Sequence, residues 1–147
     1  MNLFGMLEIS GSALTAERQR AQIVTANMAN AQTTHTPEGG PYRRQLVVFR
    51  AEPQPSFPMM MLAMNQGGNS SGGGVRVSQV VADRKPPILR YEQGNPDADA
   101  KGYVAYPAVD PVEEMADLLG AVRSYELNAS AIAATKSMIQ QSLDIVK

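Results

Sequence analysis

The chain contains no cysteine, and this absence removes several kinds of chemistry. Its 147 residues also include no Trp and only one His. Without thiols there are no disulfide bonds, no cysteine nucleophile and no thiolate metal site, although the cellular compartment stays open. The lone histidine, His35, stands in a polar loop without a second His beside it. We therefore expect an exposed loop residue there rather than a metal ligand.

An excess of charge of one sign is missing as well. The 13 Lys and Arg residues are balanced by 14 Asp and Glu residues, and aromatic residues make up only 5% of the chain. Binding to nucleic acid needs a concentrated basic surface, and single strands also need aromatic side chains on which bases stack. The sequence therefore predicts no nucleic-acid partner.

Long hydrophobic runs are also absent. No stretch reaches the roughly 18 apolar residues that a membrane-spanning helix needs. The N-terminus does not show a positively charged start followed by an apolar run and a cleavage site. We expect no membrane span and no cleaved secretory signal, so a protein that leaves the cytoplasm would do so by another route.

Helical patterns occupy both ends of the chain, whereas the 12 Gly and 10 Pro residues crowd into the middle. The sequence predicts an α+β fold in which two long terminal helices pair as a coiled coil around a small β-rich module. The three segments are an N-terminal helix in residues 1–34, the module in 35–108 and a C-terminal helix in 109–147. Parallel and antiparallel pairing are both open.

The stretch from Asp110 onward predicts one long helix that organises the chain. Asp110 suits the N-cap, Pro111 suits the first helical position, and Glu113 lies where a capping box places its acidic residue. Glu114 adds negative charge at the positive end of the helix dipole. Apolar residues then follow alternating steps of three and four, a heptad pattern. This predicted seam consists of Met115, Leu118, Val122, Tyr125, Ile132, Ile139, Leu143 and Val146.

A second apolar strip lies about 200° around the same helix from Tyr125, at about 100° per residue. A helix that is apolar on opposite faces needs a partner on each face. One partner can come from the same chain, and we expect the other from a neighbouring molecule. This C-terminal apolar strip consists of Gly120, Leu127, Ala131, Ala134, Met138 and Ile145.

The N-terminal segment predicts the helix that supplies the partner within the chain. Residues 13–31 have a helical pattern, and the sequence Ser-Gly-Ser at residues 10–12 predicts a hinge or a helix start. An apolar residue recurs every seven positions, as in the long C-terminal helix. The N-terminal members of the predicted seam are Leu7, Leu14, Ala21 and Met28.

The middle of the chain predicts short strands at residues 42–50, 75–82, 88–91 and 102–106. An excursion at 53–74 interrupts them, because its prolines break a strand ladder and its glycines form a flexible tether. Within this excursion, three consecutive methionines form an apolar cluster that serves either as a plug in the module or as an adaptable contact surface. We favour the contact surface. These residues are Met59, Met60 and Met61.

The acidic residues of the chain do not form a convincing catalytic or metal site. Asp97 and Asp99 fit turn formation, and Asp110 and Glu113 fit helix capping. The glycine run lacks the Lys-Ser/Thr ending of a phosphate-binding loop. We therefore expect no cofactor, no metal and no enzymatic activity, and the unpaired helical faces favour an assembly protein.

Two ordered sets of motifs support this interpretation. Residues 12–20 and 25–33 resemble the N-terminal signature of bacterial flagellar rod, hook and related axial proteins. Residues 91–104, 109–115 and 123–128 then narrow the resemblance to rod proteins of that family. Alternatives are another axial or adaptor protein exported by a type III apparatus, and a small enzyme with carboxylates at Asp97 and Asp99.

The resemblance implies a structural subunit of the proximal rod, which assembles helically, surrounds the export channel and transmits torque across the periplasm. It implies export through the flagellar type III apparatus without a cleaved signal peptide. Its implied partners are further copies of the chain, other rod subunits and the MS-ring/rod junction protein. Asn27 and Asn30 match the family's Asn-x-x-Asn motif, which implies hydrogen bonds between subunits. The residues themselves indicate only the polar end of the first helix.

Overall fold

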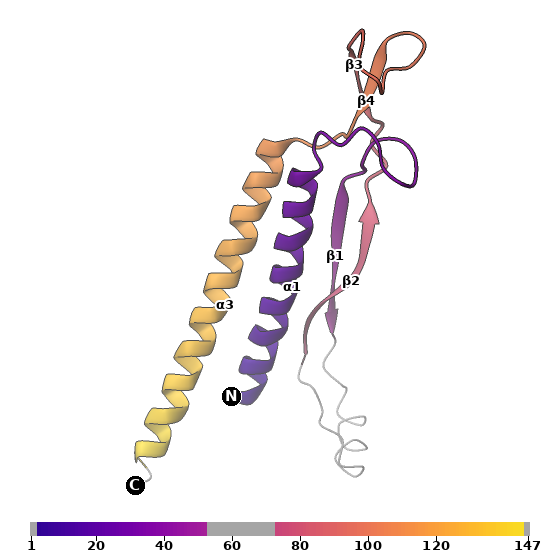
Figure 1. Cartoon of the computed structure of the whole chain (residues 1–147). Helices are drawn as coiled ribbons and strands as arrows, with labels where there is room; N and C mark the ends of the chain where they lie inside the picture. Colours follow the sequence, from indigo (N-terminus) through magenta and orange to yellow (C-terminus); the bar gives the residue numbers. More distant parts are fainter. Residues whose placement is uncertain (1–2, 53–72, 146–147) are drawn as a thin grey trace, which may run out of the picture. The chain divides into compact units, whose positions relative to one another are not determined.

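A computed structural model describes residues 3–52 and 73–145 of the chain (Figure 1). Along the sequence, one long helix precedes four short strands and a second long helix follows them. The prediction of an α+β fold with small strands between terminal helices is confirmed. Neither of the helices in the described ranges is long and apolar enough to cross a membrane. The elements are α1 (Leu3–Ala29), β1 (Gln45–Glu52), β2 (Gly74–Ala82), β3 (Ile88–Tyr91), β4 (Tyr103–Tyr106) and α3 (Pro111–Ile145).

Helix α3 begins as its sequence predicts. The backbone N–H of Val112 donates to Oδ1 of Asp110 at 2.9 Å, so Asp110 is the N-cap. Pro111 is the first helical residue, where its missing N–H has no cost. The predicted capping role of Glu113 is replaced by an ion pair, because its carboxylate accepts from Nη1 of Arg44 at 3.2 Å.

Helix α1 runs without a break through residues 10–12, so the predicted hinge is wrong. The hydroxyl of Ser12 donates to the carbonyl of Ile9 at 2.7 Å, and that of Thr15 donates to the carbonyl of Gly11 at 3.1 Å. These hydroxyls bond back to the preceding turn and leave the helix intact.

The strands form two separate two-stranded sheets, β1 with β2 and β3 with β4. Figure 1 shows β1 and β2 running in opposite directions. In the antiparallel β3–β4 pair, Ile88 lies opposite Tyr106 and Tyr91 opposite Tyr103. Strand β3 has its predicted bounds. Strand β2 begins at Gly74, the last residue of the predicted excursion, and residues 53–72 of that excursion lie outside the described residues.

The turn between β3 and β4 explains two of the acidic residues. Oδ1 of Asp99 accepts from the backbone N–H of Lys101 at 2.8 Å and of Tyr103 at 2.9 Å. Gly102, at φ +81°, packs against the ring of Tyr91, where an added Cβ would lie 2.9 Å from a ring carbon. Asp97 follows Asn95, whose side chain accepts from the Asp97 N–H at 3.0 Å. The predicted role of Asp97 and Asp99 in a turn is confirmed.

The chain divides into two compact units, each with described residues from both helices and from the strands. The first unit comprises the described parts of Met1–Gln19, Phe49–Ser78 and Ala121–Lys147. The second unit comprises Arg20–Val48 and Gln79–Gly120. Buried side chains of the first unit are Ala16, Ala121 and Thr135, whereas those of the second include Val24, Val104, Val109 and the polar Asn27, Arg44 and Glu114.

Within the first unit, β2 starts directly against α1. The backbone N–H of Val75 donates to Oγ of Ser12 at 3.1 Å. A Cβ added to Gly74 would lie 2.8 Å from that Oγ and 3.4 Å from Cβ of Ser12. The strand backbone can approach the helix this closely only because residue 74 has no side chain.

Candidate assembly interface

Asn27 joins three elements of the second unit. Its Nδ2 donates to the carbonyl of Gln45 and to Oε2 of Glu114, both at 2.9 Å. Its Oδ1 accepts from the Gln45 N–H at 2.8 Å and from the hydroxyl of Tyr42 at 2.9 Å. The side chain is only 1% exposed, and all four hydrogen-bonding positions of the amide are used within the chain.

Asn30 sits where α1 ends. Its Nδ2 donates to the carbonyl of Ala26 at 2.9 Å, and its Oδ1 accepts from the hydroxyl of Thr33 at 3.2 Å. These bonds match the role at the end of the first helix. The predicted hydrogen bonds between subunits stay a prediction, and for Asn27 they would require one of its bonds within the chain to open.

Sequence reasoning missed the centre of this arrangement, a buried ion pair between Arg44 and Glu114. Nε of Arg44 donates to Oε1 of Glu114, whose side chain is 1% exposed. The two outer nitrogens of the same guanidinium reach Glu113 at 3.2 Å and Asp117 at 3.4 Å. The signal available was the spacing of Glu113, Glu114 and Asp117, which places three carboxylates in the first two turns of α3.

The environment raises the pKa of two groups in this arrangement, Arg44 and Tyr42. Burial lowers the pKa of Arg44, but the carboxylates of Glu114 and Glu113 outweigh it, so the net shift of the pKa is upward. Burial and then the charge of Glu114 raise the pKa of Tyr42 above its ordinary value. The Tyr42 hydroxyl therefore stays protonated and can donate to Asn27.

The ion pairs also show how α1 and α3 pair within the second unit. Asn27 bonds to Glu114, and Arg20, earlier on α1, pairs at 3.3 Å with Asp117, later on α3. Contacts that move backward along one helix as they move forward along the other are antiparallel. The question left open by the sequence is thus answered for this segment.

The buried line on α3 lies one residue before the predicted seam, and on α1 the buried Asn27 likewise precedes the seam residue Met28. On α3 the buried residues are Glu114, Ala121 and Thr135, whereas Met115 is 54% exposed and Val122 43% exposed. The polar cluster occupies this line, which displaces the more apolar residues outward. Among the other seam residues, Tyr125 and Leu143 are exposed, Leu7, Leu14, Ala21, Met28, Leu118, Ile132 and Ile139 are half-buried, and Val146 lies outside the described residues.

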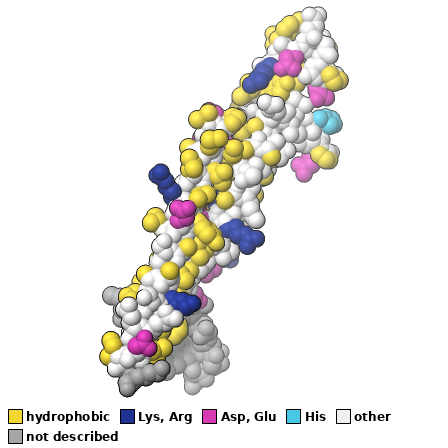
Figure 2. Space-filling view, turned by 60° about the vertical axis from the view of Figure 1, so that its left-hand side comes forward, with side chains coloured by type: hydrophobic (Ala, Val, Ile, Leu, Met, Phe, Trp, Pro, Cys, Tyr) yellow, Lys and Arg dark blue, Asp and Glu magenta, His cyan; other side chains and the backbone are white. Residues whose placement is uncertain are grey.

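Two apolar surfaces of α3 are consequently exposed, and Figure 2 shows hydrophobic side chains gathered along this side of the helix. We call the first the N-terminal apolar stripe, and it lies about 120° around the helix from Glu114. It consists of Val112, Met115, Leu119 and Val122. The second is the predicted C-terminal apolar strip, and each of its members, Gly120, Leu127, Ala131, Ala134, Met138 and Ile145, is exposed.

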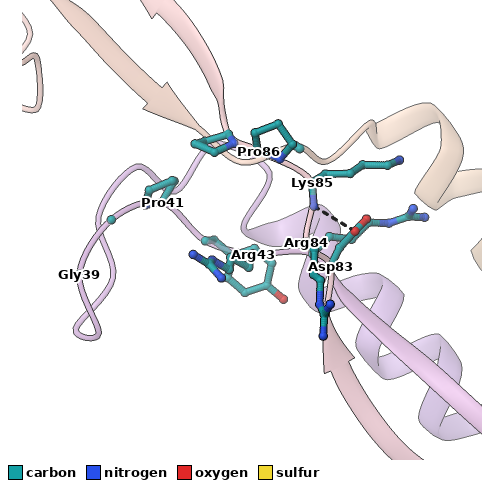
Figure 3. Close-up of a pocket in the computed structure, with 12 residues that line it drawn as sticks. Gly39, Pro41, Arg43, Asp83, Arg84, Lys85 and Pro86 are labelled. Atoms are coloured by element: carbon teal, nitrogen blue, oxygen red, sulfur yellow. Dashed lines mark hydrogen bonds between the residues drawn. The ribbon is translucent and has the colours of Figure 1, made fainter.

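A cavity of about 270 Å³ in the second unit involves none of the predicted site residues. It lies between residues 39–44 and 83–87, with Ala108 completing its lining (Figure 3). The backbone N–H of Lys85 donates to Oδ1 of Asp83 at 3.2 Å. The side chains of Arg43 and Lys85 point in opposite directions in Figure 3, so these two basic groups do not converge on one ligand.

The remaining candidate groups show no ligand geometry. His35 is exposed in its loop, as predicted. Within residues 3–52 and 73–145, no group of three or more His, Cys, Asp or Glu residues is arranged to hold a metal ion. Met59, Met60 and Met61 lie outside the described residues, so their contact role stays a prediction.

Known proteins resemble the whole chain. The flagellar basal-body rod protein FlgC of Bacillus subtilis (strain 168) is 41% identical over 151 residues, covering 100% of both chains. The chain belongs to the FlgC family of flagellar basal-body rod proteins. The FlgC protein of Borreliella burgdorferi is 38% identical, covering 100% of this chain and 99% of its own, and that of Yersinia enterocolitica is 40% identical, covering 99% and 98%.

A family description matches the C-terminal part on its own. Residues 100–145 match the family described as the C-terminal part of the flagellar basal body rod FlgEFG proteins. This range includes β4 and all of α3, the helix that carries both exposed apolar surfaces. FlgC family membership identifies a structural rod subunit, and the adaptor and enzyme alternatives are not favoured.

Proposed function

We propose that the chain is a subunit of the proximal rod, in which the helices pack into a helical wall around the export channel, and that both apolar surfaces of α3 contact neighbouring subunits. The observation that carries the proposal is the exposure of α3. Leu119 is 59% exposed and Leu127 is 72% exposed, on different faces of one helix. Burying a side chain of this size stabilises an assembly by about 1.5–3 kcal/mol, so the large apolar members of the two surfaces together contribute substantially.

Membership of the FlgC family supports this proposal. A rod subunit transmits torque across the periplasm and requires extensive contacts along its helices, without any catalytic group. Export would proceed through the flagellar type III apparatus, without a cleaved signal peptide. The partners would be further copies of the chain, the other proximal and distal rod subunits, and the MS-ring/rod junction protein.

The C-terminal apolar strip is tested by the double variant Ala131→Glu/Ala134→Glu. Two buried carboxylates without partners would prevent packing between subunits, so we expect loss of motility while export of the chain continues. The matched control is Ser130→Glu/Ser137→Glu, which adds the same charge to exposed positions of the same helix outside the strip. Normal motility in the first variant, or equal loss in both, would contradict the proposed contact.

The place in the rod needs a separate experiment. A photo-crosslinking amino acid at Leu127, introduced into the chain in cells, should capture copies of the chain or another rod subunit. A second reporter at Met115 samples the other apolar surface. Recovery of crosslinks to distal rod subunits alone, with none to the MS-ring/rod junction protein or a proximal subunit, would overturn the proximal position.

A further inference from the structure

In the second unit, α3 could turn either of two faces toward α1, an apolar face or the face that carries Glu114. The N-terminal apolar stripe includes Val112, Met115 and Leu119, whose burial would remove apolar surface from water. The face that is turned inward instead carries Glu114, and burial of a charge is unfavourable unless every polar group around it finds a partner. The apolar face is exposed, and a charged face is buried.

The hydrogen bonds of Asn27 specify this arrangement. Its amide bonds both the N–H and the carbonyl of Gln45, as a neighbouring strand would, and thereby ties β1 to α1. The same amide then donates to Glu114 of α3. One side chain thus sets the positions of a strand and a second helix relative to α1.

The guanidinium of Arg44 adds a restraint on rotation. Its three nitrogens contact Glu113, Glu114 and Asp117, and these carboxylates are spread over an arc of about 100° of α3. A rotation of about 120° would bring the N-terminal apolar stripe inward, and it would break all three contacts and the bond from Asn27. The polar cluster therefore distinguishes between two rotational settings of the helix.

We propose that Asn27, Arg44 and Glu114 form a rotational lock that holds the N-terminal apolar stripe of α3 outward in the free subunit, where a second subunit can bind it. Without the lock, α3 turns this stripe toward α1 of the same chain, which buries the stripe and makes it unavailable to a second subunit. The purpose of the lock rests on the proposed function, whereas its effect on the free chain does not.

A general property of buried ion pairs leads to a specific expectation for the proposed lock. Replacing a complete buried ion pair by apolar residues of similar volume is often neutral or stabilising in proteins. Such a pair is therefore not needed for folding as such, and it can serve to select one arrangement. The lock predicts that an apolar replacement of the whole cluster folds but presents a different face of α3.

The absence of cysteine from the chain makes a direct test possible. A single reporter, Leu119→Cys, is placed in the full-length free chain, and its reaction with a maleimide is timed. The same reporter is placed in the variant Asn27→Leu/Arg44→Met/Glu114→Leu. Labelling relative to an exposed reporter at Lys85→Cys should slow at least about tenfold, the factor that corresponds to about 1.4 kcal/mol. Circular dichroism should show unchanged helix content.

Two controls separate rotation from general loosening. The variant Glu52→Leu/Arg76→Met removes an exposed ion pair of the first unit, whose atoms lie 3.2 Å apart, and should leave the labelling rate unchanged. A folded triple variant that labels at the wild-type rate would overturn the lock. If it does not fold, Arg44→Met/Glu114→Met is measured in the same way, and unfolding of both would show that the cluster supports the fold without selecting a face.

The outcome is distinguishable from failure of the proposed function. The labelling experiment uses the free chain, so it succeeds or fails whatever the chain assembles with. If labelling slows but the Ala131→Glu/Ala134→Glu variant stays motile, the lock stands and the proposed assembly contact of the C-terminal strip fails. If labelling is unchanged and motility is lost, the proposed contact stands and the lock fails.

Discussion

The two units of the chain use different means to bring α1 near the rest of the molecule. The second unit buries Asn27, Arg44 and Glu114, which are joined by specific hydrogen bonds and ion pairs. The first unit buries the small residues Ala16, Ala121 and Thr135. Small side chains allow close approach but bury little apolar area, so they contribute little stability. The second unit is thus specified within one chain, and we expect the described part of the first unit to depend more on neighbours.

The largest expected effect removes one partner from the second unit. In Glu114→Ala, Arg44 stays buried and loses its principal carboxylate, which should lower the free energy of unfolding by about 3–5 kcal/mol. Urea denaturation followed by circular dichroism measures this loss. The control Glu52→Ala removes one partner of an exposed pair in the first unit and should change stability by about 1 kcal/mol or less. Equal losses in the two variants would remove the distinction between the units.

Hydrogen exchange on the free chain tests the comparison directly. Amides of residues 20–29 and 111–120 should exchange at least about a hundredfold more slowly than those of 6–16 and 124–142, a difference of about 2.7 kcal/mol in opening free energy. In the assembled rod, the slow exchange should extend to both sets because neighbours then cover α3. Uniform protection of both helices in the free chain would contradict the dependence of the first unit on its neighbours.

A smaller effect concerns the contact between β2 and α1 in the first unit. Gly74→Ala places a Cβ 2.8 Å from Oγ of Ser12, so we expect a loss of about 1–2 kcal/mol from overpacking. Ser12→Ala removes that oxygen and leaves Cβ of Ser12 at 3.4 Å. The double variant should therefore cost less than the sum of the two single variants, by about 0.5 kcal/mol or more. Strictly additive losses would show that the contact is looser than its geometry indicates.

Local chemistry made part of this fold predictable. Asp110 followed by Pro111 set the start of α3, and the β-branched and aromatic residues between Pro87 and the following turn set the bounds of β3. In these cases the determining residues are neighbours in the chain, so composition and spacing were sufficient.

The rotation of the helices was not predictable in this way. Apolar periodicity marks more than one face of α3, and it favoured the line through Met115 over the line through Glu114. The deciding interaction joins Glu114 to Arg44, 70 residues earlier in the chain. An acidic residue in the first turn of a helix already has a sufficient local explanation in the dipole, so the position of Glu114 did not by itself mark it as buried.

The smallest expected effect probes the edge of the polar cluster in the second unit. Tyr42→Phe removes the hydroxyl that donates to Oδ1 of Asn27 at 2.9 Å, and we expect a loss of about 1 kcal/mol at neutral pH. Because burial and then the charge of Glu114 raise the pKa of Tyr42 above its ordinary value, the folded state binds this proton more tightly than the unfolded chain does. The resulting stability is fully present below the unfolded pKa and is lost as pH rises through the folded pKa.

The variant should therefore lose less stability than the wild type when both are titrated upward from pH 9 in urea denaturation experiments. Tyr106, whose pKa is raised mainly by its hydrogen bond to Glu92, supplies the matched control. It is half-buried at the edge of the β3–β4 pair and does not contact Asn27, so Tyr106→Phe should leave the contribution of Tyr42 in place. An unchanged alkaline slope in Tyr42→Phe would show that the Asn27 amide is held by Gln45 and Glu114 alone, which would reduce the lock to its contacts with β1 and α3.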